Sequence, residues 1–433
     1  MSSLDRIAAA RVVVRSGRIT GATGSVLRAR LPGAAIGEVC ELLDANGAPR
    51  LRAEVIGFRD GEVVLVPIGD LAGLPMDAEV RATGAPRSGA VGDALLGRVI
   101  DAAGRPLDGA PAAVGLVDRP LHRAPPAPLE RALIDTPLPT GVRAIDGLLT
   151  CARGQRVGIF GEPGGGKSTL LGALVRGTAC DVCVVCLVGE RGREVREFLE
   201  RTLGPDALAR SVVVVATSDR PAIERTSAAD LATCVAEWFR DQGKDVLLVL
   251  DSLTRFARAE REIALNAGEL PARRGFPNSV LARLPGLLER AGPAASGSIT
   301  AFYTVLVEGD GTGDPVAEEV RSILDGHVVL SAELAARAHY PAIDVLRSRS
   351  RLADAVVAPD HRRDAVEFTS LWAKHEEIAF LLQVGEYRAG QDPRADRAVE
   401  RHDAMEAFLR QDDRPVAFAE MRGALRAAVG AGS

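Results

Sequence analysis

Residues 161–168 read Gly-Glu-Pro-Gly-Gly-Gly-Lys-Ser and complete the pattern Gly-x₄-Gly-Lys-Ser. An apolar run (157–160) precedes the loop and a helical pattern (169–176) follows it. In this context glycines let backbone N–H groups approach phosphate oxygens, and the helix N-terminus favours negative charge. We expect Lys167 to reach the β- and γ-phosphates and Ser168 to hold Mg²⁺. A glycine-rich turn without nucleotide is the alternative. The expected phosphate cradle comprises Gly161, Glu162, Pro163, Gly164, Gly165, Gly166, Lys167, Ser168 and Thr169.

Two acidic residues each end an apolar run. Asp251 follows Val246–Leu250, and Glu190 follows the run 182–189. Because α/β sheets place their chemistry at the carboxyl ends of parallel strands, both should lie near the loop. We expect Asp251 to position Mg²⁺ and Glu190 to orient or activate water. Many strands end in Asp, however, and the charges after Glu190 also suit a solvated helix start.

Five apolar runs alternate with helical stretches between about 140 and 350, at 157–160, 182–188, 212–216, 246–250 and 299–305. This alternation predicts an α/β fold with a parallel sheet. Earlier, period-2 patterning over about 18–85 with tight turns predicts a small β-barrel. Residues 119–128 form a proline-rich connector. After Pro359 the apolar spacing predicts a small helical domain, with two shared faces: Ala398, Met405, Phe408 and Leu409, and Phe418, Met421, Leu425 and Ala428.

The bulk composition narrows the function classes. The chain has 433 residues, which suggests two to four domains at roughly 100–200 residues each. Its net charge of -5 gives no global basic character for binding nucleic acid. We find no apolar stretch of about 18 residues and no secretory signal at the start of the chain.

Three of the six cysteines, Cys180, Cys183 and Cys186, form the pattern CxxCxxC. A metal site is one interpretation. The segment reads as a buried strand, however, in which side chains three apart point to opposite faces. We therefore expect core thiols that cannot converge on one ion, as suits a reducing cytoplasm.

Five segments carry a resemblance over about residues 18–428: GEPGGGKST (161–169), VGERGREVREF (188–198), VLLVLDSLTRFARAEREI (246–263), RRGFPNSV (273–280) and HYPAIDVLRSRSR (339–351). They resemble the type III protein-export ATPases of injectisomes and flagella, which are relatives of the rotary F1 catalytic subunit. The resemblance implies an N-terminal tail and β-barrel (1–90), a RecA-like P-loop ATPase domain (91–358) and a helical C-terminal domain (359–433).

The same resemblance implies residue roles. Glu190 would polarise the attacking water, while Arg191 and Glu194 would order the γ-phosphate and the water shell of Mg²⁺. Arg255 would lie close to the γ-phosphate. Arg351 would be an arginine finger for the adjacent subunit, and Tyr340 would pack on adenine. Each role has a structural alternative: Arg255 as the ion-pair partner of an acid, Tyr340 as a core tyrosine, and Arg351 as one of several neighbouring arginines.

The implied function is ATP hydrolysis with Mg²⁺ by a homohexamer that energises type III secretion, releasing chaperones and unfolding or loading substrates. Implied partners are a central stalk protein, a stator or regulator protein and chaperone–substrate complexes. The implied location is cytoplasmic, at the inner-membrane secretion apparatus, with peripheral membrane association and no nucleic acid. Blocks such as Val305–Glu308 and Glu318–Arg321 favour the injectisome branch. Alternatives are a flagellar export ATPase, a rotary synthase subunit, a RecA-like translocase and a non-enzymatic nucleotide-binding ring subunit.

Overall fold

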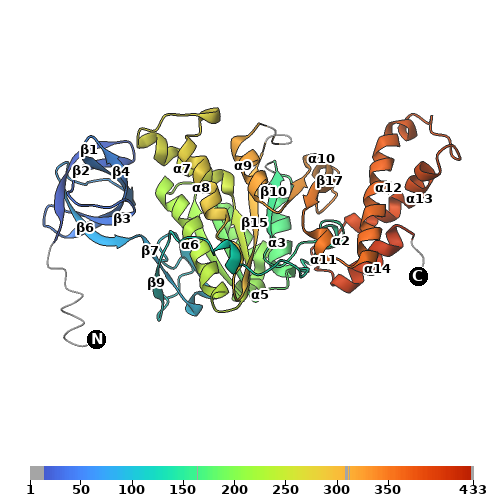
Figure 1. Cartoon of the computed structure of the whole chain (residues 1–433), viewed down its shortest axis with the longest axis horizontal. Helices are drawn as coiled ribbons and strands as arrows, with labels where there is room; N and C mark the ends of the chain where they lie inside the picture. The colour runs from blue at the N-terminus through green and yellow to red at the C-terminus, as the bar shows by residue number, and fades with distance from the viewer. Residues whose placement is uncertain (1–13, 163, 308–310, 312, 431–433) are drawn as a thin grey trace.

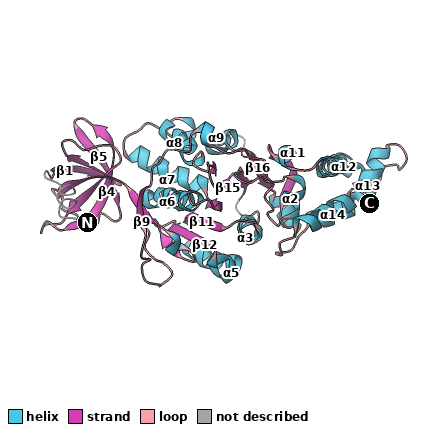
Figure 2. Cartoon of the chain, turned by 60° about the horizontal axis from the view of Figure 1, so that its bottom comes forward, coloured by secondary structure: helices cyan, strands magenta, loops and turns pink. Residues whose placement is uncertain are grey.

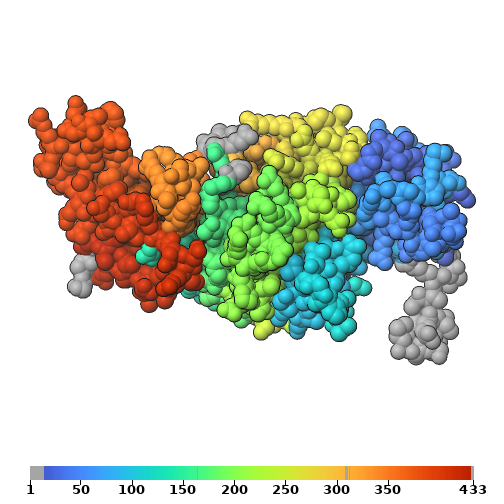
Figure 3. Space-filling view, turned by 180° about the vertical axis from the view of Figure 1, so that it is seen from behind, coloured from blue at the N-terminus to red at the C-terminus, as the bar shows by residue number. Residues whose placement is uncertain are grey.

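The computed structural model describes residues 14–162, 164–307, 311 and 313–430. Three parts follow one another along the long axis of the molecule: a barrel, a sheet covered by helices, and a group of helices (Figure 1). The space-filling view shows the barrel and the C-terminal helices at opposite ends of an elongated body (Figure 3). Residues 1–13 of the predicted N-terminal domain lie outside the described residues.

The barrel closes in the order β1-β2-β5-β4-β3-β6. The predicted period-2 pattern is present, because Leu27, Ala29 and Leu31 are buried while Arg28 and Arg30 are exposed. Closing the sheet leaves no free strand edge. Its strands are β1 (Ser16–Thr23), β2 (Val26–Arg30), β3 (Glu38–Leu43), β4 (Pro49–Arg59), β5 (Glu62–Ile68) and β6 (Glu79–Pro86).

The central sheet has the order β17-β16-β10-β15-β13-β11-β12-β8. All five predicted runs are strands: β10 (Arg156–Gly161), β11 (Val182–Glu190), β12 (Ser211–Thr217), β13 (Asp245–Asp251) and β15 (Ser298–Leu306). They run parallel, so their carboxyl ends share one edge of the sheet. β8 (Val99–Asp101) and β16 (Gly326–Leu330) extend the parallel set, and β17 (Ile343–Ser350) closes one side antiparallel. β14 (Gly292–Pro293) pairs with β15, and β7 (Ser88–Val91) pairs with β9 (Val117–Pro120) in a separate ribbon.

Helices cover both faces of the central sheet, which explains why its strands are continuous apolar runs (Figure 2). One buried cluster joins the sheet to α6 (Ala222–Arg240), α7 (Leu253–Asn266), α8 (Asn278–Leu288) and α9 (Pro315–Ile323). The other joins it to α3 (Lys167–Gly177) and to the C-terminal helices. The remaining helices are α2 (Arg143–Leu148), α4 (Gly192–Glu197), η3 (Phe198–Leu203), α5 (Gly204–Ala209), α10 (Ala332–Ala336) and α11 (Ala353–Val356), with short turns η1 (Asp93–Leu95), η2 (Pro128–Glu130) and η4 (Arg273–Gly275).

The C-terminal part consists of α12 (Pro359–Gln383), α13 (Pro393–Leu409) and α14 (Phe418–Ala428). The two predicted apolar faces pack against α2 and the sheet domain, with Met405, Phe408, Met421 and Leu425 all buried. No helix within the described ranges is long and apolar enough to cross a membrane.

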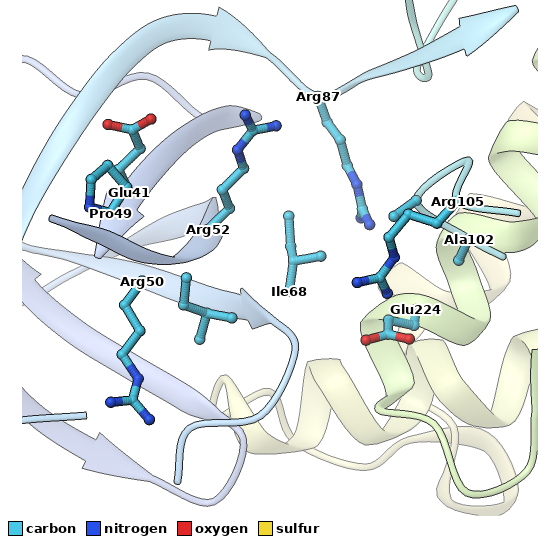
Figure 4. Close-up of a pocket in the computed structure, with 11 residues that line it drawn as sticks. Glu41, Pro49, Arg50, Arg52, Ile68, Arg87, Ala102, Arg105 and Glu224 are labelled. Atoms are coloured by element: carbon cyan, nitrogen blue, oxygen red, sulfur yellow. The ribbon is translucent and has the colours of Figure 1, made fainter. Parts of the chain in front are cut away.

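Charged side chains join the barrel to the central domain. Arg87 pairs with Glu54 of β4 at 3.2 Å, and His122 Nε2 lies 3.6 Å from the same carboxylate. His122 Nδ1 is also 3.2 Å from a guanidinium nitrogen of Arg283 on α8. Beside this joint is a cavity of about 360 Å³, with Arg50 on its barrel side and Glu224 on its central-domain side (Figure 4).

Candidate active site

The phosphate loop connects β10 to α3. Gly164 and Gly166 have φ values of 88° and 81°, a left-handed conformation that glycine adopts without a steric cost. The N–H of Gly165 donates to the carbonyl of Glu162 at 3.2 Å, which folds the loop back on itself. The loop ends directly at Lys167, where α3 begins, and the first N–H groups of a helix have no partner within the helix and favour an anion. Pro163, predicted as part of the cradle, lies outside the described residues.

Lys167 joins the two predicted acids. Its Nζ lies 2.6 Å from Asp251 Oδ1 and 3.6 Å from Glu190 Oε1. The loop, β11 and β13 are distant in sequence, but all three end at the same edge of the sheet. A phosphate-binding cation, a metal-positioning acid and a candidate base therefore lie in one cluster.

Glu190 is almost fully buried, with 8% exposure. Arg255 Nη2 lies 3.3 Å from Glu190 Oε2, and the same guanidinium donates to the carbonyl of Gly189. The buried Oε1 atom has no hydrogen-bond partner. Burial, followed by the nearby charge of Asp251, raises the pKa of Glu190 against the opposing effects of Lys167 and Arg255. A buried carboxylate with one free oxygen and a raised pKa is suited to accept a proton from water.

Asp251 is held by a residue that the sequence analysis did not identify. The Thr304 hydroxyl, buried on β15, donates to Asp251 Oδ1 at 2.7 Å. β15 lies beside β13 in the sheet, although 53 residues separate the two side chains along the chain. The only signal in the sequence was a hydroxyl residue within an apolar strand.

A cavity of about 300 Å³ lies beside these groups and is lined by Ser168, Thr169, Glu190, Glu194 and Asp251, among others. Hydroxyl and carboxylate oxygens are the ligands that Mg²⁺ prefers, and Mg²⁺ usually keeps several waters and substrate phosphate oxygens. The described residues contain no group of three or more His, Cys, Asp or Glu suited to hold a metal. The oxygens present thus fit Mg²⁺ carried in with a nucleotide rather than a metal held by protein alone.

Arg191 and Glu194 lie on the rim of this cavity. They form an ion pair with each other at 3.3 Å, and the Arg191 side chain is 75% exposed. Glu194 lines the cavity, whereas Arg191 is not among the residues that line it. The structure thus places Glu194 in the predicted site and leaves Arg191 at its edge.

Tyr340 lies against the phosphate loop. A Cβ on Gly166 would come within 3.2 Å of its ring, and the side chain is 40% exposed, so it is not a core tyrosine. It shares a small pocket with Val142, Ala173 and the segment 411–413 of the C-terminal part. The Gln411 N–H donates to the Tyr340 carbonyl at 2.8 Å. The fold thus brings a segment of the C-terminal part to the loop, although the two lie far apart in the sequence.

Arg351 lies at the other end of the sheet. β17 runs antiparallel to β16, with Ile343 beside Leu330 and Ser350 beside Gly326. Arg351 donates its backbone N–H to the Asp325 carbonyl at 2.9 Å, next to the start of β10. β10 alone spans about 17 Å at 3.3 Å per residue. Arg351 is therefore not part of the cluster around Lys167 of its own chain.

Together, the barrel, the parallel sheet and the loop with its two acids define a P-loop ATP hydrolase of the ATP synthase type. Family models agree: the nucleotide-binding domain of the ATP synthase alpha/beta family matches residues 141–350, and the beta-barrel domain of that family matches 19–84. The T3SS EscN ATPase C-terminal domain matches residues 357–427.

A "Type 3 secretion system ATPase" of Sinorhizobium fredii is 60% identical over 93% of this chain and 89% of its own. The assembled ATPase EscN of enteropathogenic E. coli has a TM-score of 0.91 at 47% identity, covering 95% of this chain and 100% of its own. EscN in complex with its central stalk EscO gives 0.88 at 47% identity, with the same coverage. The chain belongs to the type III secretion ATPase family, which confirms the predicted fold class, the resemblance and the ATP hydrolase activity.

Proposed function

We propose that this chain hydrolyses Mg²⁺-ATP as a homohexameric ring that energises type III protein secretion, releasing chaperones and unfolding or loading export substrates. The position of Arg351 supports this proposal most directly. Each chain carries the phosphate loop and its acids at one edge of the sheet and Arg351 at the opposite edge. A site that uses Arg351 therefore needs a second copy of the chain.

We assign the chemical roles from the geometry. Lys167 would exchange its carboxylate contacts for phosphate oxygens, and Ser168, Asp251 and Glu194 would face Mg²⁺ and its waters. Mg²⁺, when bound, neutralises the developing charge on the phosphate oxygens. Glu190 would hold the attacking water through its free Oε1 and take its proton, while Arg255 fixes the other carboxylate oxygen. Thr304 would keep Asp251 in place.

The remaining predicted roles follow from position. Tyr340 would pack on the adenine, with Gln411 bounding the pocket. Arg191, exposed at the rim, would order the γ-phosphate only after a side-chain movement. Arg351 would act as the arginine finger of the neighbouring subunit. The domain limits 1–90, 91–358 and 359–433 stay predictions.

The partners are proposed from the relatives. The solved complex of EscN with a central stalk supports a stalk protein in the centre of the ring. A stator or regulator protein and chaperone–substrate complexes would complete the set, without nucleic acid. The C-terminal helices are the expected docking surface. The ring would work in the cytoplasm, attached peripherally to the secretion apparatus at the inner membrane.

The test compares Arg351→Ala with the control Arg349→Ala, an exposed arginine on β17. For the wild type, we expect ATPase activity per chain to rise with protein concentration. An arginine finger contributes roughly 10³–10⁵-fold to the rate, so Arg351→Ala should be nearly inactive and the control active. Arg351→Ala subunits mixed into wild-type rings should reduce activity by more than their fraction. Constant activity per chain, with a reduction only in proportion to the mixed fraction, would contradict the ring mechanism.

A further inference from the structure

Two of the three thiols in the CxxCxxC segment meet. Cys180 Sγ lies 3.4 Å from Cys183 Sγ. Cys186 points the other way, into the buried cluster on the opposite face of the sheet. The predicted alternation therefore holds for Cys183 and Cys186. It is wrong for Cys180 and Cys183, because β11 begins only at Val182 and Cys180 lies in irregular backbone before it.

The guanidinium of Arg210 places a positive charge beside this pair of thiols. Its Nη1 atom lies 3.4 Å from Cys180 Sγ and donates to the Cys180 carbonyl at 3.0 Å. Its Nη2 atom donates to the Val175 carbonyl at 2.6 Å, near the end of α3. These backbone contacts fix the guanidinium beside the sulfur. A cation next to a thiol favours the thiolate, which is the reactive form.

The two thiols are unequal. Cys180 is half-buried and reachable from solvent, whereas Cys183 is fully buried. The hydrogen bond from Cys183, together with Arg210, lowers the pKa of the Cys180 thiol against the opposing effect of burial. The same hydrogen bond and burial raise the pKa of Cys183. This is the arrangement of an attacking thiol with a resolving thiol behind it.

We propose that Cys180 and Cys183 form an oxidation site that reacts with hydroperoxides and closes to an intrachain disulfide. The Cys180 thiolate attacks one peroxide oxygen, the O–O bond breaks, and the leaving oxygen takes up a proton as water when the oxidant is hydrogen peroxide. Cys180 becomes a sulfenic acid. The Cys183 sulfur then attacks the Cys180 sulfur, the S–S bond forms, and the hydroxyl leaves as water with the proton of Cys183. One peroxide is reduced and two thiols lose two electrons.

The pair Cys180–Cys183 is neither the metal site that the CxxCxxC pattern could suggest nor a part of the active site. Two thiols alone do not make a metal centre, and the described residues offer no third ligand of the His, Cys, Asp or Glu type. β11 separates the pair from Glu190 by about 23 Å at 3.3 Å per residue. To form the bond, the sulfurs need to approach from 3.4 Å to about 2.05 Å. We expect this local movement to leave the ATPase rate within about twofold of the reduced enzyme, since it does not reach the catalytic groups.

The test treats the reduced full-length protein with hydrogen peroxide and maps the linkage. Asp181 lies between the two cysteines, so cleavage before Asp181 separates Cys180 from Cys183 and Cys186. The matched control is Cys186→Ser, which removes the other thiol of the same strand. We expect both wild type and control to give two fragments joined across Asp181, and a dithiol reductant to separate them. Cys183→Ser should stop at a sulfenic acid on Cys180 that a dimedone probe traps.

The fragment mapping of the wild-type protein tests the proposal by itself, so a variant that folds poorly does not weaken the test. Fragments that stay unlinked after peroxide would overturn the proposal. So would a linkage of Cys180 to any cysteine other than Cys183. A Cys180 thiol that alkylates no faster than buried Cys151 would remove the attacking role.

Discussion

Replacing Glu190 by glutamine should separate ATP binding from ATP hydrolysis. Glutamine keeps the shape of the side chain and the contact with Arg255, but it cannot accept a proton from water. Lys167 keeps its closer partner Asp251 at 2.6 Å, so the phosphate loop should stay intact. Removal of a carboxylate 3.6 Å from Lys167 also removes a negative charge that opposes the phosphates. We therefore expect the KM for ATP to be unchanged or lower while kcat falls.

The size of the loss follows from the role of the base. A positioned general base contributes about 10²–10⁴-fold to a rate. At about 1.4 kcal/mol per tenfold, this corresponds to roughly 3–5 kcal/mol of transition-state stabilisation.

The same substitution should raise the free energy of unfolding, although it lowers kcat. The pKa of Glu190 is raised in the folded protein, so its favourable contribution is present below the ordinary value of 4.5 and is lost as pH rises through the folded-state pKa. The nucleotide-free Glu190→Gln protein should therefore be more stable than wild type at neutral pH.

The assay is phosphate release under saturating Mg²⁺-ATP, with single-turnover measurements to isolate the chemical step. Nucleotide affinity and urea unfolding are measured on the same preparations. The matched control is Glu200→Gln, a side chain 60% exposed that pairs with Arg196 at 2.8 Å. The wild-type kcat should fall toward acid pH, beginning above the range of an ordinary glutamate, because only the carboxylate accepts a proton. Hydrolysis by Glu190→Gln at the wild-type rate would refute the assignment of the base.

Three further outcomes are expected. Thr304→Val removes the hydrogen bond to Asp251, which is worth about 1 kcal/mol, so half-maximal ATPase activity should need roughly five times more Mg²⁺. Thr304→Ser keeps the hydroxyl and should restore the wild-type value. An equal loss in both variants would contradict this role of the hydroxyl. Tyr340→Ala should raise the KM for ATP about tenfold with little change in kcat, while Tyr340→Phe keeps the stacking surface; titration of ATPase against ATP measures it. Burial raises the pKa of Glu260 to about 7. The contribution of this carboxyl group to the free energy of unfolding is therefore complete below pH 4.5 and is lost as the pH rises through about 7. Glu260→Gln should therefore gain up to about 3 kcal/mol of unfolding free energy at pH 8 and little near pH 4.5, as followed by urea unfolding.

The parts of the fold that the sequence predicted are those that depend on local patterns. Helices cover both faces of the central sheet, so its inner strands are uninterrupted apolar runs that stand out in the sequence. The edge strand β17 carries exposed Arg347 and Arg349 and does not read as such a run. The phosphate loop, Glu190 and Asp251 could be grouped in advance, because parallel strands end at one edge whatever their order.

The missed features depend on strand order and on where a strand begins. Thr304 meets Asp251 only because β15 lies beside β13, and apolar spacing does not determine that order. The Cys180–Cys183 contact arises because β11 begins at Val182, and strand limits are the least predictable part of a sequence pattern. Gln411 reaches Tyr340 through the packing of the C-terminal helices on the sheet domain.

The charges of the cluster explain why assembly should control catalysis. Lys167 and Arg255 contribute two positive charges, and Glu190 and Asp251 contribute two negative ones, so the four side chains sum to zero. The transition state of phosphoryl transfer spreads negative charge over the transferred group. Arg255 is engaged by Glu190 and the Gly189 carbonyl, and Lys167 is engaged by Asp251 at 2.6 Å, so neither cation adds positive charge beyond what the two acids already balance. Mg²⁺ arrives with every ATP and cannot by itself distinguish a lone chain from a ring. In the proposed ring, the positive charge of Arg351 from a neighbouring copy would make that distinction, because Arg351 lies at the opposite edge of its own sheet.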